Sequence, residues 1–114
     1  MQNCIFCKIL NRELKGEFVY EDDDIACIKD IHPQAPTHLL LIPKKHIPTI
    51  LDIKEEDEKL IGKMILKAGE IAQQYNISKN GFRLVFNCNK DAGQTVYHIH
   101  LHLIGGRKFN WPPG

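Results

Sequence analysis

The chain has 114 residues, of which 43% are hydrophobic and 25% are charged, and its formal net charge is +1. This length and balance predict one globular domain over residues 1–114 with a single core. The near-zero charge argues against a nucleic acid or an anionic membrane as a partner, and no apolar run approaches the roughly 20 residues of a membrane-spanning helix.

The N-terminal residues predict a short helix. Asn3 can cap a helix that runs to about Leu14, and Gly16 would end it. No basic segment followed by a long apolar stretch precedes this helix, so we expect no secretory signal and a cytoplasmic protein. In that compartment the four cysteines are more typical of thiols or metal ligands than of disulfides. Cys27 and Cys88, in apolar stretches, are interpreted as small buried hydrophobes.

The next segment predicts a hairpin and then a buried strand. Residues 18–20 and 25–28 have strand character, and the acidic run 21–24 between them is more typical of a solvated turn than of a metal site. A loop with two prolines follows at residues 30–36. Residues 37–43 form a nearly continuous apolar run, which predicts a central strand covered on both faces.

The middle of the chain predicts one long helix. Asp52 with Glu55 resembles a capping box that opens a helix to about Tyr75. Its apolar stripe would consist of Leu60, Ile61, Met64, Ile65, Ala68, Ile71, Ala72 and Tyr75. A strand over residues 82–87 and a polar loop over 89–94 follow. Hairpin-linked strands with one long helix predict an α+β domain with an antiparallel sheet.

Three histidines alternate with aliphatic residues near the C-terminus. In a strand, His98, His100 and His102 would share one face and the intervening aliphatic residues the other. The backbones of His98 and His102 would then lie about 13 Å apart, too far to hold one ion together. His98 and His100 can still supply two ligands of a catalytic zinc. The alternative is catalysis by His100 as a nucleophile, whose second ring nitrogen must be held by an acceptor.

Residues around this stretch can support that chemistry. Gly93 permits a close backbone approach, and Gln94 and Thr95 bring short polar groups next to His100. Asn87 can bind a substrate hydroxyl or leaving group, or can simply form a turn. His38, alone in an aliphatic strand, is more typical of a satisfied core or edge residue unless it lies near the three histidines.

The cysteine pair Cys4 and Cys7 has two interpretations. As a redox pair it would benefit from the start of a helix, but it lacks the preceding strand of a thioredoxin-like motif. As half of a zinc site it needs two more ligands, which histidines can supply.

Several stretches together resemble the histidine triad (HIT) superfamily, and more closely its Hint-like branch of nucleoside phosphoramidate hydrolases. The matching stretches are residues 30–38, 42–46, 93–98 and 98–104, with the end of the chain at 105–107 and 111–114. The resemblance implies the HIT-like fold: an antiparallel meander sheet with one long and one short N-terminal helix, and the sheet continued across a homodimer. The implied ligands are purine nucleoside monophosphates, AMP or GMP.

The resemblance also implies roles for individual residues. His100 would attack the α-phosphorus to give a nucleotidyl-histidine that water hydrolyses. The His98 carbonyl would hold the other nitrogen of His100, and His102, joined by His38, would bind the phosphoryl oxygens. Asp30 would contact the ribose of the substrate, and the base would be contacted by Phe6, Ile9, Ile28 and Ile31. The phosphate and leaving group would be contacted by Asn87, Gly93 and Thr95. Trp111 would reach the site of the partner subunit.

The same resemblance favours zinc over redox chemistry for the cysteines. Cys4, Cys7, His46 and His98 would hold a structural Zn²⁺, with no organic cofactor, and would leave His100 free for catalysis. Thr95 departs from the family pattern, in which serine is more usual. Competing functions are hydrolysis of dinucleoside polyphosphates by the same residues, a nucleotide-binding interaction module with vestigial activity, and the zinc hydrolase above.

Overall fold

The computed structural model describes residues 3–114. The elements in chain order are α1 (Ile5–Leu10), β1 (Phe18–Glu21), β2 (Ile25–Lys29), β3 (Thr37–Pro43), the 3₁₀ turns η1 (Ile50–Asp52) and η2 (Glu55–Asp57), α2 (Glu58–Gln74), β4 (Phe82–Val85), α3 (Asn89–Ala92) and β5 (Leu101–Gly105).

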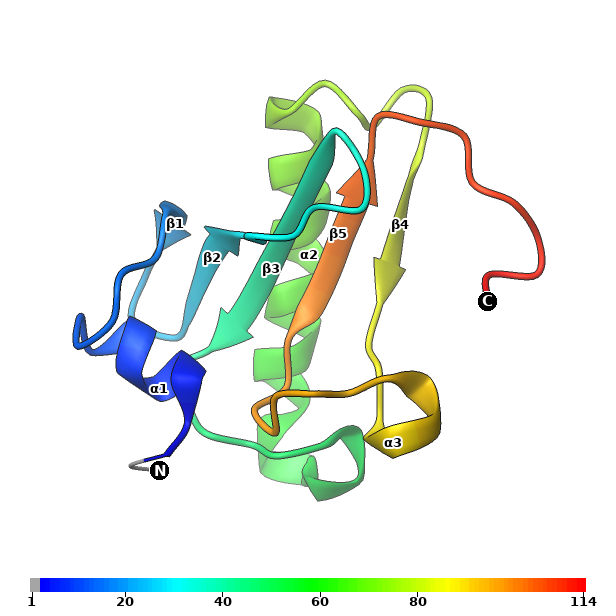
Figure 1. Cartoon of the computed structure of the whole chain (residues 1–114). Helices are drawn as coiled ribbons and strands as arrows, with labels where there is room; N and C mark the ends of the chain where they lie inside the picture. The colour runs from blue at the N-terminus through cyan, green and yellow to red at the C-terminus, as the bar shows by residue number, and fades with distance from the viewer. Residues whose placement is uncertain (1–2) are drawn as a thin grey trace.

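The five strands form one antiparallel sheet in the order β1-β2-β3-β5-β4 (Figure 1). β3 lies at its centre, and six of its seven residues are buried, as the apolar run predicts. The predicted α+β domain with an antiparallel sheet and one long helix is therefore confirmed, but β5 lies between β3 and β4, so the sheet is not a simple meander. None of the helices within residues 3–114 is long and apolar enough to cross a membrane.

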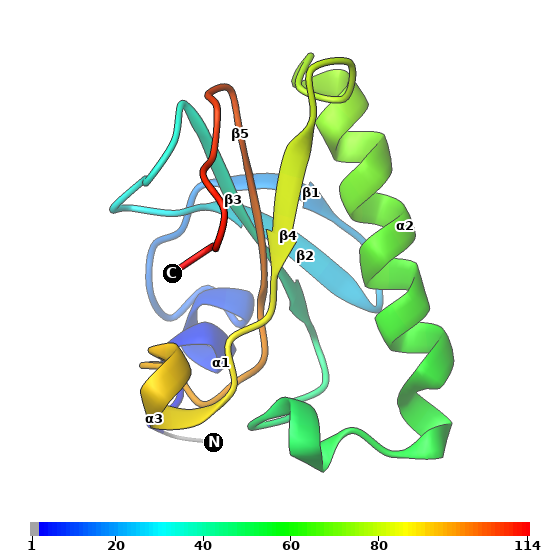
Figure 2. The same cartoon turned by 90° about the vertical axis from the view of Figure 1, so that its right-hand side faces the viewer.

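The two faces of the sheet carry different residues because side chains alternate along each strand. α2 covers one face, and α1 lies against the other (Figure 2). Leu39, Leu41, Leu101 and Leu103 pack toward α2 in the larger core cluster. Leu40 and Ile42 of β3 pack instead with Phe6 of α1 and Ile28 of β2 in a second cluster. The face away from α2 is thus the face that β3 and β5 share with α1.

The N-terminal helix is shorter than predicted, and the predicted cap is wrong. Cys4 is its N-cap, and the Sγ atom of Cys4 accepts a hydrogen bond from the backbone N–H of Cys7 at 3.3 Å. The helix ends at Leu10 because Asn11 leaves the helical conformation and Arg12 has a φ of 67°. It therefore stops well before Leu14 and Gly16.

The long helix also begins later than predicted. Thr49 forms the capping box with Asp52, and this box opens the short η1 turn rather than α2. α2 starts at Glu58 and reaches Gln74, next to the predicted end. Its buried stripe contains Met64, Ala68, Ile71 and Ala72. Ile65 was expected in this stripe, but 48% of it is exposed.

The C-terminal half differs from the prediction in three places. β4 ends at Val85 rather than residue 87, and the expected polar loop contains the short helix α3. β5 begins only at Leu101, so the prediction of a strand that carries all three histidines is wrong. The N–H of Ile99 bonds to the carbonyl of Ile47 at 2.8 Å. His98 and His100 therefore lie in an irregular segment before the strand.

Candidate functional site

His38 and His102 meet on the sheet face away from α2. His38 is the second residue of β3, His102 lies in neighbouring β5, and the His38 Nε2 and His102 Nδ1 atoms are 2.9 Å apart. The backbone N–H of Gln34 donates to His38 Nδ1 at 3.0 Å. Because that nitrogen accepts a hydrogen, the neutral ring of His38 carries its own hydrogen on Nε2. His38 therefore donates to His102, and His102 carries its hydrogen on Nε2.

Asp30 completes this arrangement. Its Oδ2 atom lies 3.3 Å from His38 Nε2, and the three side chains bring ligand atoms within 4.8 Å of one another. This trio resembles a metal site, but the hydrogen on His38 Nε2 occupies the nitrogen that would have to bind the ion. We therefore interpret His38 and His102 as a hydrogen-bonded pair with the Asp30 carboxylate beside it, and we call His38 with His102 the histidine relay.

His100 has the opposite tautomer. Its Nδ1 atom lies 2.8 Å from the main-chain carbonyl of His98. A carbonyl can only accept, so the hydrogen of the His100 ring is on Nδ1 and the Nε2 lone pair is free. The centroid of its ring lies 5.0 Å from that of His102. A nucleophilic nitrogen and a hydrogen-bond donor thus stand side by side.

Burial keeps these rings neutral. It lowers the pKa of His38, although Asp30 raises that pKa in part. Burial also lowers the pKa of His100, against the hydrogen bond to the His98 carbonyl. The pKa of His102 falls to about 4, first through burial and then through repulsion by His100 and His38. Neutral rings at pH 7 are what the two tautomers described above require.

A second group of side chains joins α1 to the segment before β5. The Sγ atoms of Cys4 and Cys7 and the Nδ1 atoms of His46 and His98 all lie within 4.8 Å of one another. His98 Nδ1 is 3.3 Å from Cys4 Sγ, 3.5 Å from Cys7 Sγ and 3.2 Å from His46 Nδ1. We call these four residues the metal group.

The metal group fits a tetrahedral ion. Zinc–sulfur bonds of about 2.3 Å and zinc–nitrogen bonds of about 2.0–2.1 Å would place the ligand atoms about 3.3–3.8 Å apart, close to the spacing observed. His98 Nε2 donates to the carbonyl of Pro43 at 2.7 Å, which leaves Nδ1 as a lone pair for an ion. Burial lowers the pKa of His98 to about 4, so the ring is neutral. Burial raises the pKa of Cys7 to about 11, so an ion must displace its proton.

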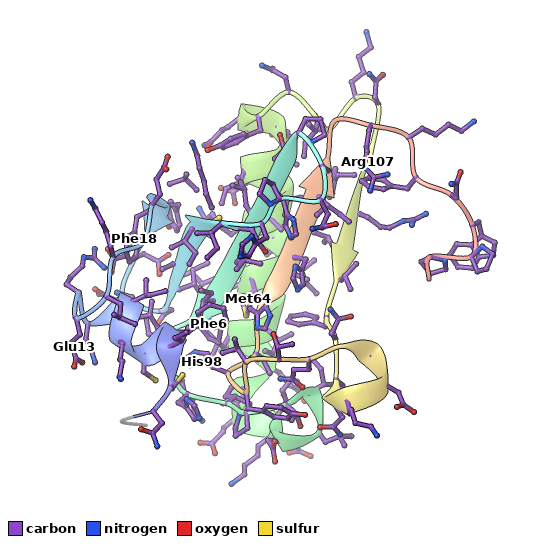
Figure 3. All side chains as sticks on the ribbon, in the orientation of Figure 1. Phe6, Glu13, Phe18, Met64, His98 and Arg107 are labelled. Atoms are coloured by element: carbon purple, nitrogen blue, oxygen red, sulfur yellow. The ribbon has the colours of Figure 1, made fainter. Side chains whose placement is uncertain are left out.

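The predicted base-contacting residues are only partly brought together. Phe6 and Ile28 are buried in one cluster, and Ile9 packs against it. Figure 3 labels Phe6 of α1 close to His98, and the centroids of their rings are 6.0 Å apart. Ile31, in contrast, is 86% exposed in the loop after β2.

The loop before His98 is shaped by two residues. Gly93 ends α3 with a φ of 87°, a conformation that favours glycine. Gln94 is buried, and its side chain bonds to three backbone groups: it donates to the carbonyls of Pro48 and Val96 and accepts from the N–H of Asn89. The polar side chain of Gln94 therefore braces the loop, and Thr95 beside it is exposed.

The remaining candidates lie farther along the surface. Asn87 is half-buried after β4, and Trp111 is 82% exposed in the C-terminal tail. Both line one open surface cleft of about 860 Å³, together with Phe109.

Two backbone groups of this site escaped the sequence-based prediction. The N–H of Gln34 sets the tautomer of His38, and the carbonyl of Pro43 sets that of His98. Main-chain atoms are the same in every residue except for the missing N–H of proline, so residue type gives no signal for them.

Comparisons with known proteins agree with the sequence motifs. Residues 3–110 match the family model described as "Scavenger mRNA decapping enzyme C-term binding". An uncharacterised HIT-like protein of Synechocystis is 50% identical over 113 residues, which are 99% of this chain and 98% of that protein. The purine nucleoside phosphoramidase of Escherichia coli is 49% identical over 106 residues, which are 93% of this chain and 89% of the enzyme.

Solved structures are similar over the same range. A HIT family hydrolase from Legionella pneumophila superposes with a TM-score of 0.96 at 54% identity, covering 98% of this chain and all of that one. A histidine triad protein from Clostridium difficile superposes with a TM-score of 0.92 at 37% identity, covering 96% of each chain.

Proposed function

Because the chain belongs to the histidine triad superfamily and is a nucleotide hydrolase, we propose that it hydrolyses purine nucleoside phosphoramidates at the α-phosphorus. The observation that carries this proposal is the 2.8 Å contact between His100 Nδ1 and the His98 carbonyl, which leaves the other nitrogen of His100 free to attack. The similarity to the phosphoramidase of Escherichia coli supports the substrate class.

The reaction has two steps. First, the Nε2 lone pair of His100 forms a bond to phosphorus, and the phosphorus–nitrogen bond to the substrate amine breaks. The electron pair leaves with the amine, which takes up a proton. Water then attacks phosphorus, the bond to His100 breaks, and its electron pair returns to Nε2. The products are an amine and a nucleoside monophosphate, and water replaces the proton that the amine removed.

The histidine relay would stabilise negative charge on the phosphoryl oxygens in both steps. His102 carries its hydrogen on Nε2 because His38 occupies its Nδ1. A donor next to His100 can bind the phosphoryl oxygens, whose negative charge grows during attack. Thr95 and Gly93 would contact the phosphate and leaving group from the loop, together with Asn87.

The substrate nucleoside would lie between α1 and the loop after β2. Asp30 would bind the ribose hydroxyls, and Phe6, Ile9 and Ile28 would contact the base, with Ile31 closing over it from the exposed loop. We propose AMP and GMP as the product nucleotides.

We propose Zn²⁺ as the occupant of the metal group. Two thiols and two imidazoles are a common structural zinc set, and the spacing of their ligand atoms supports it. When bound, the ion would join α1 to the segment before β5. We also propose a cytoplasmic location, because a reducing compartment would keep Cys4 and Cys7 as thiols that can bind the ion.

We also propose that the protein is a homodimer. β4 is an edge strand, and all four of its residues are only half-buried in one chain. Pairing of two β4 strands would satisfy the free backbone groups and continue the sheet. The exposed Trp111 would then reach the site of the partner subunit.

The decisive experiment measures turnover of an adenosine phosphoramidate at pH 7 by the wild type and by His100→Ala. We expect the variant to lose activity by at least a thousandfold and the wild type to yield a nucleotidyl adduct on His100 after an alkaline quench. His32→Ala, which changes an exposed histidine, is the matched control and should keep its activity. Wild-type turnover by His100→Ala would refute the proposal.

The competing functions predict other results. Faster turnover of a dinucleoside polyphosphate would favour that substrate class. Tight nucleotide binding without turnover would indicate an interaction module. A rate that a chelator abolishes, with no trapped adduct, would indicate a zinc hydrolase that uses His98 and His100 as ligands.

A further inference from the structure

We propose that the metal group positions the nucleophile, with His98 and Phe6 as the positioning residues that connect it to His100. This inference rests on the proposed function only in taking His100 as the nucleophile. It concerns how the ring of His100 is held, and it assigns no chemical step to the metal.

The first connection runs through His98. The ring of this residue is fully buried, with Nδ1 among the other three members of the metal group and Nε2 bonded to Pro43. Its main-chain carbonyl accepts from His100 Nδ1. One residue is therefore held at both ring nitrogens while its backbone fixes the tautomer of His100. A change in the position of His98 must move the carbonyl that orients the nucleophile.

The second connection runs through Phe6, which lies between Cys4 and Cys7 in sequence. Its ring is 6% exposed and contacts two histidines edge-on: the ring centroids are 6.0 Å apart for His98 and 4.9 Å apart for His100. The two thiols therefore flank the side chain that packs against the nucleophile. α1 has only six residues, too few to be stable alone, so its position depends on such contacts.

An ion matters because the ligand atoms of the metal group have mainly one another as hydrogen-bond partners. The Nδ1 atoms of His46 and His98 face each other at 3.2 Å, and the hydrogen on His98 Nε2 makes its Nδ1 an acceptor. The thiols can offer only weak S–H donors to this nitrogen. Four ligand atoms converge on one point, and a cation there would attract all of them. Its removal is expected to loosen α1 and the His98 segment together.

The two roles of Phe6 predict different kinetics for a substitution. If Phe6 only contacts the base, Phe6→Leu should raise KM and leave kcat unchanged. If Phe6 also positions His100, the variant should lower kcat by about tenfold or more in addition to any change in KM, since small misplacements of a reacting atom reduce rates strongly. Leu10→Ala is the matched control, because Leu10 packs in the same cluster from the same helix. It should keep both constants.

A spectroscopic test does not depend on activity. Protein labelled with ¹⁵N at histidine would be recorded with zinc, after removal of zinc by a chelator, and after reloading. We expect one sharp Nδ1–H signal for His100 in the loaded protein. The signal should broaden or shift toward a tautomer mixture on stripping and return on reloading. Cys88→Ser, which changes a cysteine outside the metal group, should behave as the wild type.

Two results would overturn the proposal: an unchanged His100 tautomer in folded, metal-free protein, or a Phe6→Leu variant with raised KM and normal kcat. If stripping unfolds the chain, the Phe6→Leu kinetics decide the question in the loaded protein. His100→Ala distinguishes the two proposals. An inactive His100→Ala with either overturning result removes only the positioning role, whereas an active His100→Ala removes the proposed function itself.

Discussion

His38 and His102 are 64 residues apart in sequence, yet His38 Nε2 donates to His102 Nδ1 across neighbouring strands at 2.9 Å. Register explains the contact: His38 pairs with Ile104 and His102 with Leu40, so the two rings are diagonal neighbours on one face. The direction of the hydrogen bond follows from the Gln34 N–H on the far side of His38.

We expect His38→Leu to slow catalysis without removing the nucleophile. Without a donor at Nδ1, the hydrogen of the His102 ring would be divided between Nδ1 and Nε2. In a fraction of the molecules His102 would then have no N–H donor facing the phosphate. The kcat should fall by about 10- to 100-fold, less than in His100→Ala. Steady-state kinetics with His32→Ala as control would measure this. A normal kcat in His38→Leu would show that the relay has no catalytic role.

The same substitution at two glycines should have opposite effects on stability. Gly93 has a φ of 87° and open space around it, so Gly93→Ala introduces backbone strain without a clash and should destabilise the protein by about 1 kcal/mol. Gly62 is exposed within α2, also with open space, and Gly62→Ala should stabilise it by about 0.5–1 kcal/mol. Urea unfolding measures the free energy of unfolding of both variants. A change of the same sign in the two variants would contradict the backbone argument.

Asp22 should make stability depend on pH. Burial raises the pKa of its carboxyl, but hydrogen bonds from Tyr20, Lys63 and the N–H of Ile25 outweigh this and hold the pKa well below its usual range. A depressed folded-state pKa stabilises the protein above the ordinary carboxyl value near 4, and this stabilisation is lost as the pH falls further.

Asp22→Asn tests this dependence. We expect the variant to unfold at lower urea concentration than the wild type at pH 7, with the difference shrinking as the pH falls below about 4. Asp23→Asn, at the exposed neighbouring position, should show little difference at either pH. A gap between wild type and Asp22→Asn that stays constant with pH would rule out the charge as the cause.

Metal content tests the metal group directly. Freshly purified protein should contain about one zinc per subunit, because the four converging ligand atoms could hold one tetrahedral ion. The double variant Cys4→Ser, Cys7→Ser should contain none, while Cys88→Ser should retain the wild-type amount. Elemental analysis measures all three. Wild-type protein that takes up no zinc even when it is supplied would disprove the site.

Patterns of apolar residues were sufficient to predict most of the fold. The continuous apolar run of β3 correctly predicted a strand buried on both faces, and the stripe of α2 predicted its packing. Helix ends were harder to predict. Asp52 does join a capping box, but with Thr49 at a 3₁₀ turn, because the same local signal opens either kind of helix.

The sequence indicated which histidines and cysteines form the candidate site, but not the contacts between them. Alternation of the histidines predicted one continuous strand, yet the Ile99 N–H bonds to Ile47 and His98 turns its ring nitrogen toward the cysteines. Contacts far apart in sequence override the local pattern here. The tautomers of His38 and His98 depend on backbone groups, which no pattern of side chains can indicate.

β3 helps to position both the histidine relay and the metal group. His38 stands near its first residue, and the carbonyl of Pro43, its last residue, holds the ring of His98. Four residues lie between them, and the five steps from His38 to Pro43 correspond to a separation of about 16 Å along an extended strand. Deleting one residue inside β3 would turn His38 toward α2 and also shorten this spacer. Neither the histidine relay nor the metal group can therefore be shifted along this strand without disturbing the other. Engineering of the site should leave the length of β3 unchanged.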